Sequence, residues 1–227
     1  MSVYPTSVLG RIKQTARYLR DKVYEIGDTY GIIDPDTIYN EDYYSKRRGD
    51  PWRSDARAVS KVLYNEFQPE SVIDFGCAIG GHLEWFHEQG IEVHGVEGNP
   101  TAFEYSLIPR TNLEEHDLRE PYECSKQWDL ALCIEVAEHI PDRYSNVLVE
   151  TLTDSAETIF FTAATPGQSG THHVNLQEEI YWEKRFNERG YERENIVEDC
   201  IEKELDLEKS TWINDNMFVF SKSRGGK

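Results

Sequence analysis

The sequence S-V-I-D-F-G-C-A-I-G-G at residues 71–81 decides the fold. It begins as a short apolar strand over 71–75, turns at Gly76 and continues as a helix that we expect over 80–89, where Gly90 ends it. Glycines permit a tight turn and the close approach of a ligand to the backbone, and a helix N-terminus follows directly. A strand, a glycine turn and a helix in this order predict a ligand site at the carboxyl end of a parallel strand.

The rest of the chain alternates between strand-like and helix-like patterns. The most informative run is W-D-L-A-L-C-I at 128–134, because a nearly continuous apolar strand is expected where both faces of a sheet are covered. This alternation predicts the α/β class, with a doubly wound, mostly parallel sheet and helices on both faces. We expect further strands at 91–96, at a segment ending at Glu115 or His116, at 158–163 and at 217–221, and helices at 54–67, 100–107, 144–152, 176–189 and 196–209.

The N-terminal part of the chain has a different character. Apolar residues at three- and four-residue steps over 8–26 predict an amphipathic helix, and the outer face of this helix is basic. We expect it to pack over the binding cleft, although a basic face could also contact an acidic partner or a membrane surface. Residues 39–52 are aromatic, polar and irregular, and we expect them to form part of a lid. The predicted organisation is a helical cap and lid segment at 1–53 and the main domain at 54–227.

The chain of 227 residues is strongly acidic, with 42 Asp and Glu against 24 Lys and Arg and a net charge of −18. Such a surface repels nucleic acids and anionic membranes, so we do not expect a nucleic acid as a partner. Adaptation to high salt, which screens repulsion between carboxylates, is one hypothesis for the acidity. No apolar run approaches the ~18 residues that span a bilayer. Without a signal-peptide pattern or a C-x-x-C pair, we predict a cytoplasmic protein with reduced thiols.

Two acidic residues mark the predicted ligand site. Glu97 follows Gly76 by 21 residues, a spacing at which an acidic side chain reaches the hydroxyl groups of a bound ribose. Asp74 lies in a D-x-G-x-x-x-G pattern, which differs from the G-x-G-x-x-G that brings backbone against a pyrophosphate. A carboxylate at this position suits a cationic ligand such as S-adenosylmethionine, which carries an ammonium and a sulfonium group. Each acid alone is also compatible with a structural role, such as Glu97 at a helix N-terminus.

Four motifs in register resemble those of the class I S-adenosylmethionine-dependent methyltransferases. V-I-D-F-G-C-A-I-G at 72–80 resembles the first signature of that family, with Ala78 in place of the commoner glycine. H-G-V-E at 94–97 resembles the second signature, and H-D-L at 116–118 resembles the third. The segment 128–141, from W-D-L to E-V-A-E-H-I-P, resembles the fourth-strand signature of the small-molecule O-methyltransferases.

The resemblance extends over residues 39–221 and implies a seven-stranded, Rossmann-like fold. It implies a methyltransferase that acts on a hydroxyl group of a small molecule, sugar or lipid-linked metabolite, so the expected partner is a small-molecule or glycan-like methyl acceptor. It also implies S-adenosylmethionine as the cofactor, with Glu97 at the ribose and an acidic residue at the adenine amino group. The full set of expected cofactor-binding residues is Asp74, Gly76, Cys77, Ala78, Gly80, Glu97, Gly98, Asp117, Leu118 and Glu135.

Methyl transfer to a hydroxyl group often needs a base that removes the proton of the acceptor. The candidates are Glu138 and His139, after the fourth strand, and His172 and His173, after the fifth. Histidine, with an ordinary pKa near ~6.5, suits this work at neutral pH. These side chains could instead only orient the loops that carry them.

The same residues admit a second interpretation. Glu135, Glu138 and His139 form an E-x-x-E-H motif, with His172 or His173 downstream. This arrangement resembles the divalent-metal site of small-RNA 2′-O-methyltransferases, and carboxylates with imidazoles are suitable ligands for Mg²⁺ or Mn²⁺. We expect metal-free catalysis, because the motif also occurs in quinone O-methyltransferases and the acidic surface argues against RNA. A third hypothesis is a catalytically silent cofactor-binding or assembly protein.

Overall fold

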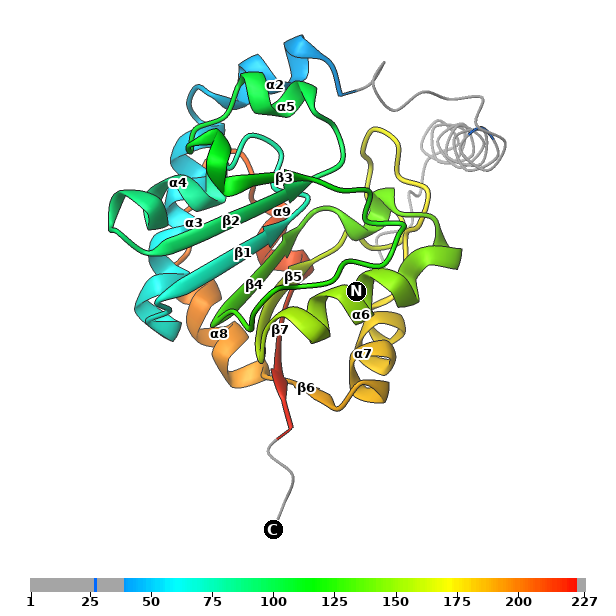
Figure 1. Ribbon diagram of the computed structural model, residues 1–227. Helices are drawn as coiled ribbons and strands as arrows, with labels where there is room; N and C mark the ends of the chain where they lie inside the picture. The colour runs from blue at the N-terminus through cyan, green and yellow to red at the C-terminus, as the bar shows by residue number, and fades with distance from the viewer. Residues whose placement is uncertain (1–26, 28–38, 224–227) are drawn as a thin grey trace, which may run out of the picture.

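The computed structural model describes residues 27 and 39–223, and its centre is one seven-stranded sheet (Figure 1). The strand order is β3-β2-β1-β4-β5-β7-β6; the first five strands in this order pair in parallel, and β7 pairs antiparallel with β5 and β6. The predicted α/β class and seven-stranded sheet are therefore confirmed. The strands are β1 (Ser71–Phe75), β2 (Glu92–Glu97), β3 (Leu113–Glu115), β4 (Leu130–Ile134), β5 (Thr158–Thr162), β6 (Tyr191–Arg193) and β7 (Met217–Lys222).

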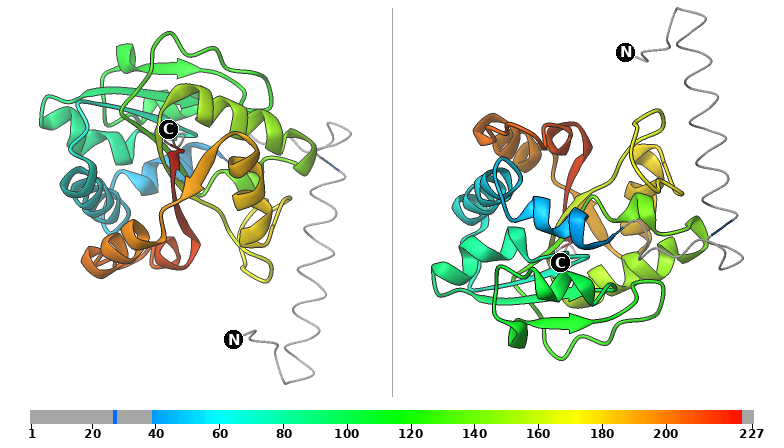
Figure 2. Two further views of the ribbon diagram at one scale, coloured as in Figure 1. Left: turned by 90° about the horizontal axis from the view of Figure 1, so that it is seen from below. Right: turned by 90° about the horizontal axis from the view of Figure 1, so that it is seen from above.

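Helices cover both faces of the sheet (Figure 2). On one face, α3, α4 and α8 bury Leu63, Phe86 and Ile201 against the strands. On the other face, α6 and α7 bury Leu152 and Trp182 in a second apolar cluster. The α-helices of residues 39–223 are α2 (Glu41–Arg47), α3 (Trp52–Phe67), α4 (Gly81–Glu88), α5 (Thr101–Glu104), α6 (Ser145–Ser155), α7 (Glu179–Glu188), α8 (Asn195–Glu204) and α9 (Trp212–Asn216).

Strands β1 and β4 lie side by side at the centre of the sheet. Every residue of β1 is buried, as the apolar run predicts for a strand covered on both faces. Successive strands extend from β1 to β3 on one side, and the chain then returns to add β4 and β5 on the other. The carboxyl ends of β1 and β4 therefore meet at the switch point, where ligand sites form in open sheets of this kind.

The segment 39–52, which we expected to be irregular, contains helix α2. The Asn40 side chain caps this helix by accepting the Tyr43 N–H at 3.2 Å. Two acidic residues in the first turn and two basic residues in the last turn complement the helix dipole. The local signals for a helix were thus present, but the aromatic and polar composition of the segment obscured them.

The helix that we expected over 196–209 ends at Glu204, and a short helix that we did not expect, α9, begins at Trp212. The cause lies in α3, where the buried Asp55 side chain accepts hydrogen bonds from three consecutive backbone N–H groups. The donors are those of residues 208–210, at 2.9, 2.8 and 2.7 Å. N–H groups used in this way are not available to an α-helix, so the chain forms a fixed loop there.

The remaining expectations concern strand β6, the N-terminal helix, the cysteines and a membrane-spanning helix. We expected no separate strand at β6, which is only three residues long. The predicted helix over 8–26 lies outside the described residues. All four cysteines lie in the described part of the chain, and none of them forms a disulfide. In the same part of the chain, no helix has both the length and the apolar character to cross a membrane.

Candidate active site

The turn between β1 and α4 is built on positive backbone φ angles. Gly76 has a φ of +76°, and a Cβ there would lie 2.4 Å from a Val136 methyl carbon. Gly80 caps α4 with a φ of +74°. Ala78 also adopts a positive φ, of +48°, which explains why the resembling methyltransferases prefer glycine there. The Cys77 side chain is buried against Gly95, and the Cys77 backbone N–H donates to the Val96 carbonyl.

Two carboxyl groups flank this turn. Asp74, at the end of β1, is buried, and its pKa is raised to about 8 by burial and by the negative charge of Glu97. Glu97, at the end of β2, accepts the N–H of Ala78 and the N–H of Asn99, each at 2.9 Å. Burial raises the pKa of Glu97, although these backbone hydrogen bonds oppose the shift. Among the described residues, no basic side chain lowers the pKa of either carboxyl group, so the pair is available to a cationic ligand.

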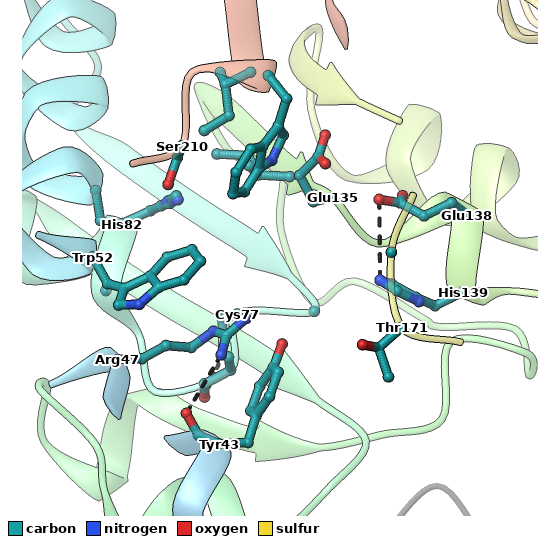
Figure 3. Close-up of a pocket in the computed structure, with 18 of the residues that line it drawn as sticks. Tyr43, Arg47, Trp52, Cys77, His82, Glu135, Glu138, His139, Thr171 and Ser210 are labelled. Atoms are coloured by element: carbon teal, nitrogen blue, oxygen red, sulfur yellow. Dashed lines mark hydrogen bonds and ion pairs between the residues drawn. The ribbon is translucent and has the colours of Figure 1, made fainter. Parts of the chain in front are cut away.

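Two cavities adjoin at the carboxyl edge of the sheet. The larger has a volume of about 710 Å³ and is partly drawn in Figure 3; the smaller has a volume of about 390 Å³. Of the expected cofactor-binding residues, Gly80 lines neither and serves to begin α4. Those that line the larger cavity are Asp74, Gly76, Cys77, Ala78 and Glu135; those that line the smaller are Gly76, Ala78, Glu97, Gly98, Asp117, Leu118 and Glu135.

Asp117 is held in an ion pair within the smaller cavity. The Arg119 guanidinium donates to Asp117 Oδ2 at 2.7 Å, and the Arg119 backbone N–H donates to Oδ1 at 2.9 Å. Burial alone would raise the pKa of Asp117, but the hydrogen bonds from Arg119 outweigh it and leave this pKa lowered. An adenine amino group at Asp117 would therefore have to share this carboxylate with Arg119.

Glu135 lies where the two cavities meet and has a positive φ of 56°. Its Oε1 atom accepts hydrogen bonds from the Thr162 hydroxyl at 2.8 Å and from the Asn216 amide at 3.0 Å. Burial raises the pKa of Glu135 against the effect of these hydrogen bonds. Strands β4, β5 and the end of α9 thus fix this carboxyl group at the centre of the site.

Glu138 and His139 lie next to each other in one wall of the larger cavity (Figure 3). Glu138 Oε1 lies 4.0 Å from His139 Nε2, and neither Glu138 oxygen has a hydrogen-bond partner in the described part of the chain. Burial, followed by the charge of Glu135, raises the pKa of Glu138 well above its ordinary value. A buried carboxyl group without a hydrogen-bond partner is costly, which makes Glu138 a candidate for contact with a ligand.

His139 does not have the pKa near 6.5 that we expected. Burial lowers its pKa to about 3, so the imidazole is neutral at physiological pH. Its Nδ1 lies 3.0 Å from the carbonyl oxygen of His172, which fixes the proton on Nδ1 and leaves the lone pair on Nε2. The Nε2 atom can therefore accept a proton or bind a metal, but it is a weak base in this environment.

The two histidines of the loop after β5 contribute differently. His173 lines the larger cavity, and ligand atoms of Glu138, His139 and His173 all lie within 4.8 Å of one another. His172 lines the smaller cavity, and its ring is 6.3 Å from the His139 ring and nearly parallel to it. The loop after β5 therefore lies beside the residues that follow β4. Its geometry gives His173, and not His172, the position beside Glu138.

Several residues of the site were not predicted. Tyr39, Tyr43, Arg47 and Trp52 line the larger cavity from α2 and its flanks, and Trp212 lines it from α9. The signal that the sequence offers for them is the aromatic character of 39–52, which predicts part of a lid and not individual contacts. These residues come from elements whose position depends on packing against the sheet, so no local motif identifies them.

The polar groups of the two cavities fit S-adenosylmethionine. The Asp74 carboxyl group would suit the ammonium of this cofactor, and Glu97 and Asp117 would offer acceptors to the ribose hydroxyls and the adenine amino group. The glycine turn and the start of α4 lie between these acids, without the glycine pattern that a pyrophosphate requires. Fold and site together define a Rossmann-like methyltransferase.

Comparison with known proteins agrees with this class. A family model described as "Methyltransferase domain" matches residues 44–195, and the chain belongs to this family of S-adenosylmethionine-dependent methyltransferases. It is similar to the solved structure of DesVI from Streptomyces venezuelae, with a TM-score of 0.62 and 14% identity over 84% of this chain and 99% of that one. At this identity the likeness concerns the fold alone.

Two curated relatives match shorter regions. A probable chloroplastic tocopherol O-methyltransferase of Oryza sativa subsp. japonica is 31% identical over 87 residues, covering 34% of this chain and 24% of the relative. A dTDP-4-amino-2,3,4,6-tetradeoxy-D-glucose N,N-dimethyltransferase of Saccharopolyspora spinosa is 24% identical over 110 residues, covering 47% of this chain and 44% of the relative. The chain thus spans less than half the length of either relative.

Proposed function

We propose that this chain methylates a hydroxyl group of a small molecule, sugar or lipid-linked metabolite. The observation that carries the proposal is the pair Glu138 and His139, which borders the larger cavity opposite the glycine turn. One relative acts on tocopherol oxygen and another on an amino sugar, which supports a small acceptor and leaves the acceptor atom to experiment. S-adenosylmethionine supplies a methyl group on a positively charged sulfur.

The protein residues have three tasks in this reaction: they hold the cofactor, accept the proton of the acceptor and orient the acceptor. Asp74 and Glu97 hold the cofactor, and Glu135, fixed by hydrogen bonds from β5 and α9, borders the point where the cavities meet. The acceptor hydroxyl must lose a proton as the methyl group moves. Glu138 is the better-matched proton acceptor because its pKa is raised, while His139 orients the acceptor through its Nε2 lone pair.

A second candidate function is methyl transfer assisted by a divalent metal ion, as in the small-RNA 2′-O-methyltransferases that the E-x-x-E-H motif resembles. The observation that favours it is the cluster of ligand atoms from Glu138, His139 and His173. A cation there would satisfy the carboxyl group of Glu138, which has no hydrogen-bond partner in the described part of the chain. The net charge of −18 opposes an RNA acceptor at low salt.

The deciding assay follows release of S-adenosylhomocysteine with a panel of phenols, hydroxy sugars, amino sugars and short RNA 3′ ends. We expect turnover with a small hydroxyl acceptor that survives EDTA and falls by ~10²-fold in the His139→Ala variant, the loss expected when an acceptor is no longer oriented. The His87→Ala variant is the matched control, because His87 is exposed and lines neither cavity.

Loss of turnover in EDTA with recovery in Mn²⁺ would establish the second candidate in place of the first. Unchanged turnover in the His139→Ala variant would remove this residue from both mechanisms. Turnover with amines but not with hydroxyls would retain the site and correct the acceptor atom.

A further inference from the structure

The larger cavity contains one cation that no carboxylate neutralises. The guanidinium of Arg47, at the end of α2, lies 3.4 Å from the centre of the Tyr43 ring and 4.9 Å from that of Trp52. These cation–π contacts, with a hydrogen bond of 3.4 Å to the Tyr43 carbonyl, hold the group in the cavity wall (Figure 3). Within the described part of the chain, Arg47 takes part in no ion pair.

The guanidinium of Arg53, unlike that of Arg47, is paired with a carboxylate. Arg53 is the other arginine that lines this cavity, and it donates its Nε–H to Glu84 at 2.8 Å with a second hydrogen bond to the same carboxylate. Its charge is therefore already satisfied. Arg47 is half-buried beside aromatic rings, and this burial lowers its pKa. A partly desolvated cation without an anion is unfavourable unless a ligand supplies the anion.

The cofactor brings one negative charge into a negative cavity. The carboxyl groups of Asp74, Glu135 and Glu138 line this space; they suit the ammonium and sulfonium groups but repel the α-carboxylate of S-adenosylmethionine. The backbone N–H groups of residues 76–78 cannot bind it, because all three already donate within the protein. Among the lining side chains, Arg47 is the remaining positive group.

We propose that Arg47 binds the α-carboxylate of S-adenosylmethionine, in a site walled by Tyr43 and Trp52. In S-adenosylmethionine the ammonium and the carboxylate are attached to the same carbon atom. Because Asp74 and Arg47 line the same cavity, the ammonium would meet Asp74 and the carboxylate would meet Arg47. The planar guanidinium can donate two parallel hydrogen bonds to a carboxylate, which lysine cannot. This inference rests on the cofactor of the family and not on the proposed acceptor, so its test contains no acceptor.

Calorimetry should compare S-adenosylmethionine with decarboxylated S-adenosylmethionine, which keeps both cationic groups and lacks only the carboxylate. We expect the wild-type protein to prefer the carboxylate-bearing ligand. The Arg47→Met variant should bind S-adenosylmethionine about 10- to 100-fold more weakly, the loss expected for a charge-assisted hydrogen bond, and decarboxylated S-adenosylmethionine within about twofold of wild type.

The Arg48→Met variant is the matched control, since Arg48 is the next residue, is exposed and lines neither cavity. If the Arg47→Met protein does not fold, the Arg47→Lys variant should show a smaller loss that is again confined to the carboxylate-bearing ligand. Equal losses for both ligands would overturn the proposal and leave Arg47 with the role of holding α2. Unchanged affinity for S-adenosylmethionine would overturn the proposal as well. A raised KM for the methyl acceptor in the same variant would then indicate that Arg47 binds the acceptor.

Discussion

Ionisation of the single residue Asp74 should make the affinity for the cofactor depend on pH. The Asp74 pKa of about 8 means that the carboxyl group is largely protonated at neutral pH, and the ammonium of the cofactor favours the ionised form. Binding should therefore release a proton, and affinity should fall as the pH falls below 8. The sign follows because the ligand-free protein holds the proton that the complex gives up.

The measurement is calorimetry between about pH 6 and 7.5, below the pKa of ~8 at which an α-amino group itself loses its proton. We expect affinity for S-adenosylmethionine to fall by up to about tenfold per pH unit. Titrations in two buffers of different ionisation enthalpy should show proton release approaching one per site. The Asp74→Asn variant should bind more weakly and without this pH dependence. A flat profile in the wild-type protein would contradict the coupling.

Glu97 is expected to bind the ribose hydroxyls of the cofactor. Charge-assisted hydrogen bonds of this kind contribute roughly 1.5–3 kcal/mol, so the Glu97→Ala variant should bind S-adenosylmethionine about 10- to 150-fold more weakly. Glu115→Ala is a suitable control, because Glu115 pairs with Glu97 across β2 and β3 but is exposed and lines neither cavity. Calorimetry that finds equal affinities in the two variants would remove Glu97 from the ribose.

At the scale of elements, the glycine turn depends on its packing against β2. A Cβ on Gly95 would lie 2.6 Å from Cys77 Sγ and 2.8 Å from a Leu113 methyl carbon. The Gly95→Ala variant should therefore displace the turn, lowering the free energy of unfolding by roughly 1–3 kcal/mol and weakening cofactor binding. Urea denaturation and calorimetry measure the two effects.

The Gly95→Ala and Cys77→Ala double variant tests the cause of this expected loss. Removing Sγ makes room for the new methyl group, so the double variant should recover part of both the stability and the cofactor affinity. Additive losses in the double variant would show that the Leu113 contact, and not the turn, is responsible.

The sequence predicted the elements whose character is set locally. β1 and β4 are apolar runs, and the turn after β1 shows its glycines directly, so their positions followed from the pattern. The break between α8 and α9 could not be predicted, because it depends on hydrogen bonds from residues 208–210 to Asp55, about 150 positions earlier in the chain. Contacts of this range leave no periodic signal.

The same distinction applies to the site. Asp74 and Glu97 lie at the ends of β1 and β2, and Glu138 lies in the turn after β4. Parallel strands bring their carboxyl ends to one edge, so these acids could be placed together. Arg47 and Trp212 could not, because they reach the cavity from helices that dock beside the sheet. The charge of His139 was also beyond the sequence, since burial in the folded protein sets its pKa.

At the scale of the whole molecule, negative charge is distributed unevenly. Residues 1–24 hold five basic side chains and one acidic side chain, a net +4, so the rest of the chain carries −22 to reach −18. Surface ion pairs such as Arg57 with Glu88 and Arg189 with Asp154 screen individual carboxylates, but their arginines are already counted in this net charge. The remaining carboxylates repel one another in the compact state at low ionic strength.

This repulsion predicts that salt stabilises the protein. Raising KCl from about 0.1 M to about 2 M shortens the screening length from ~10 Å to less than ~3 Å, so the melting temperature should rise by several degrees. Sucrose at equal osmolality controls for solute exclusion. Removing three exposed carboxylates that form no ion pair in the described structure, by Glu66→Gln, Glu123→Gln and Glu202→Gln, should reduce the salt dependence. A melting temperature that stays flat or falls in KCl would reject adaptation to high salt as the cause of the acidity.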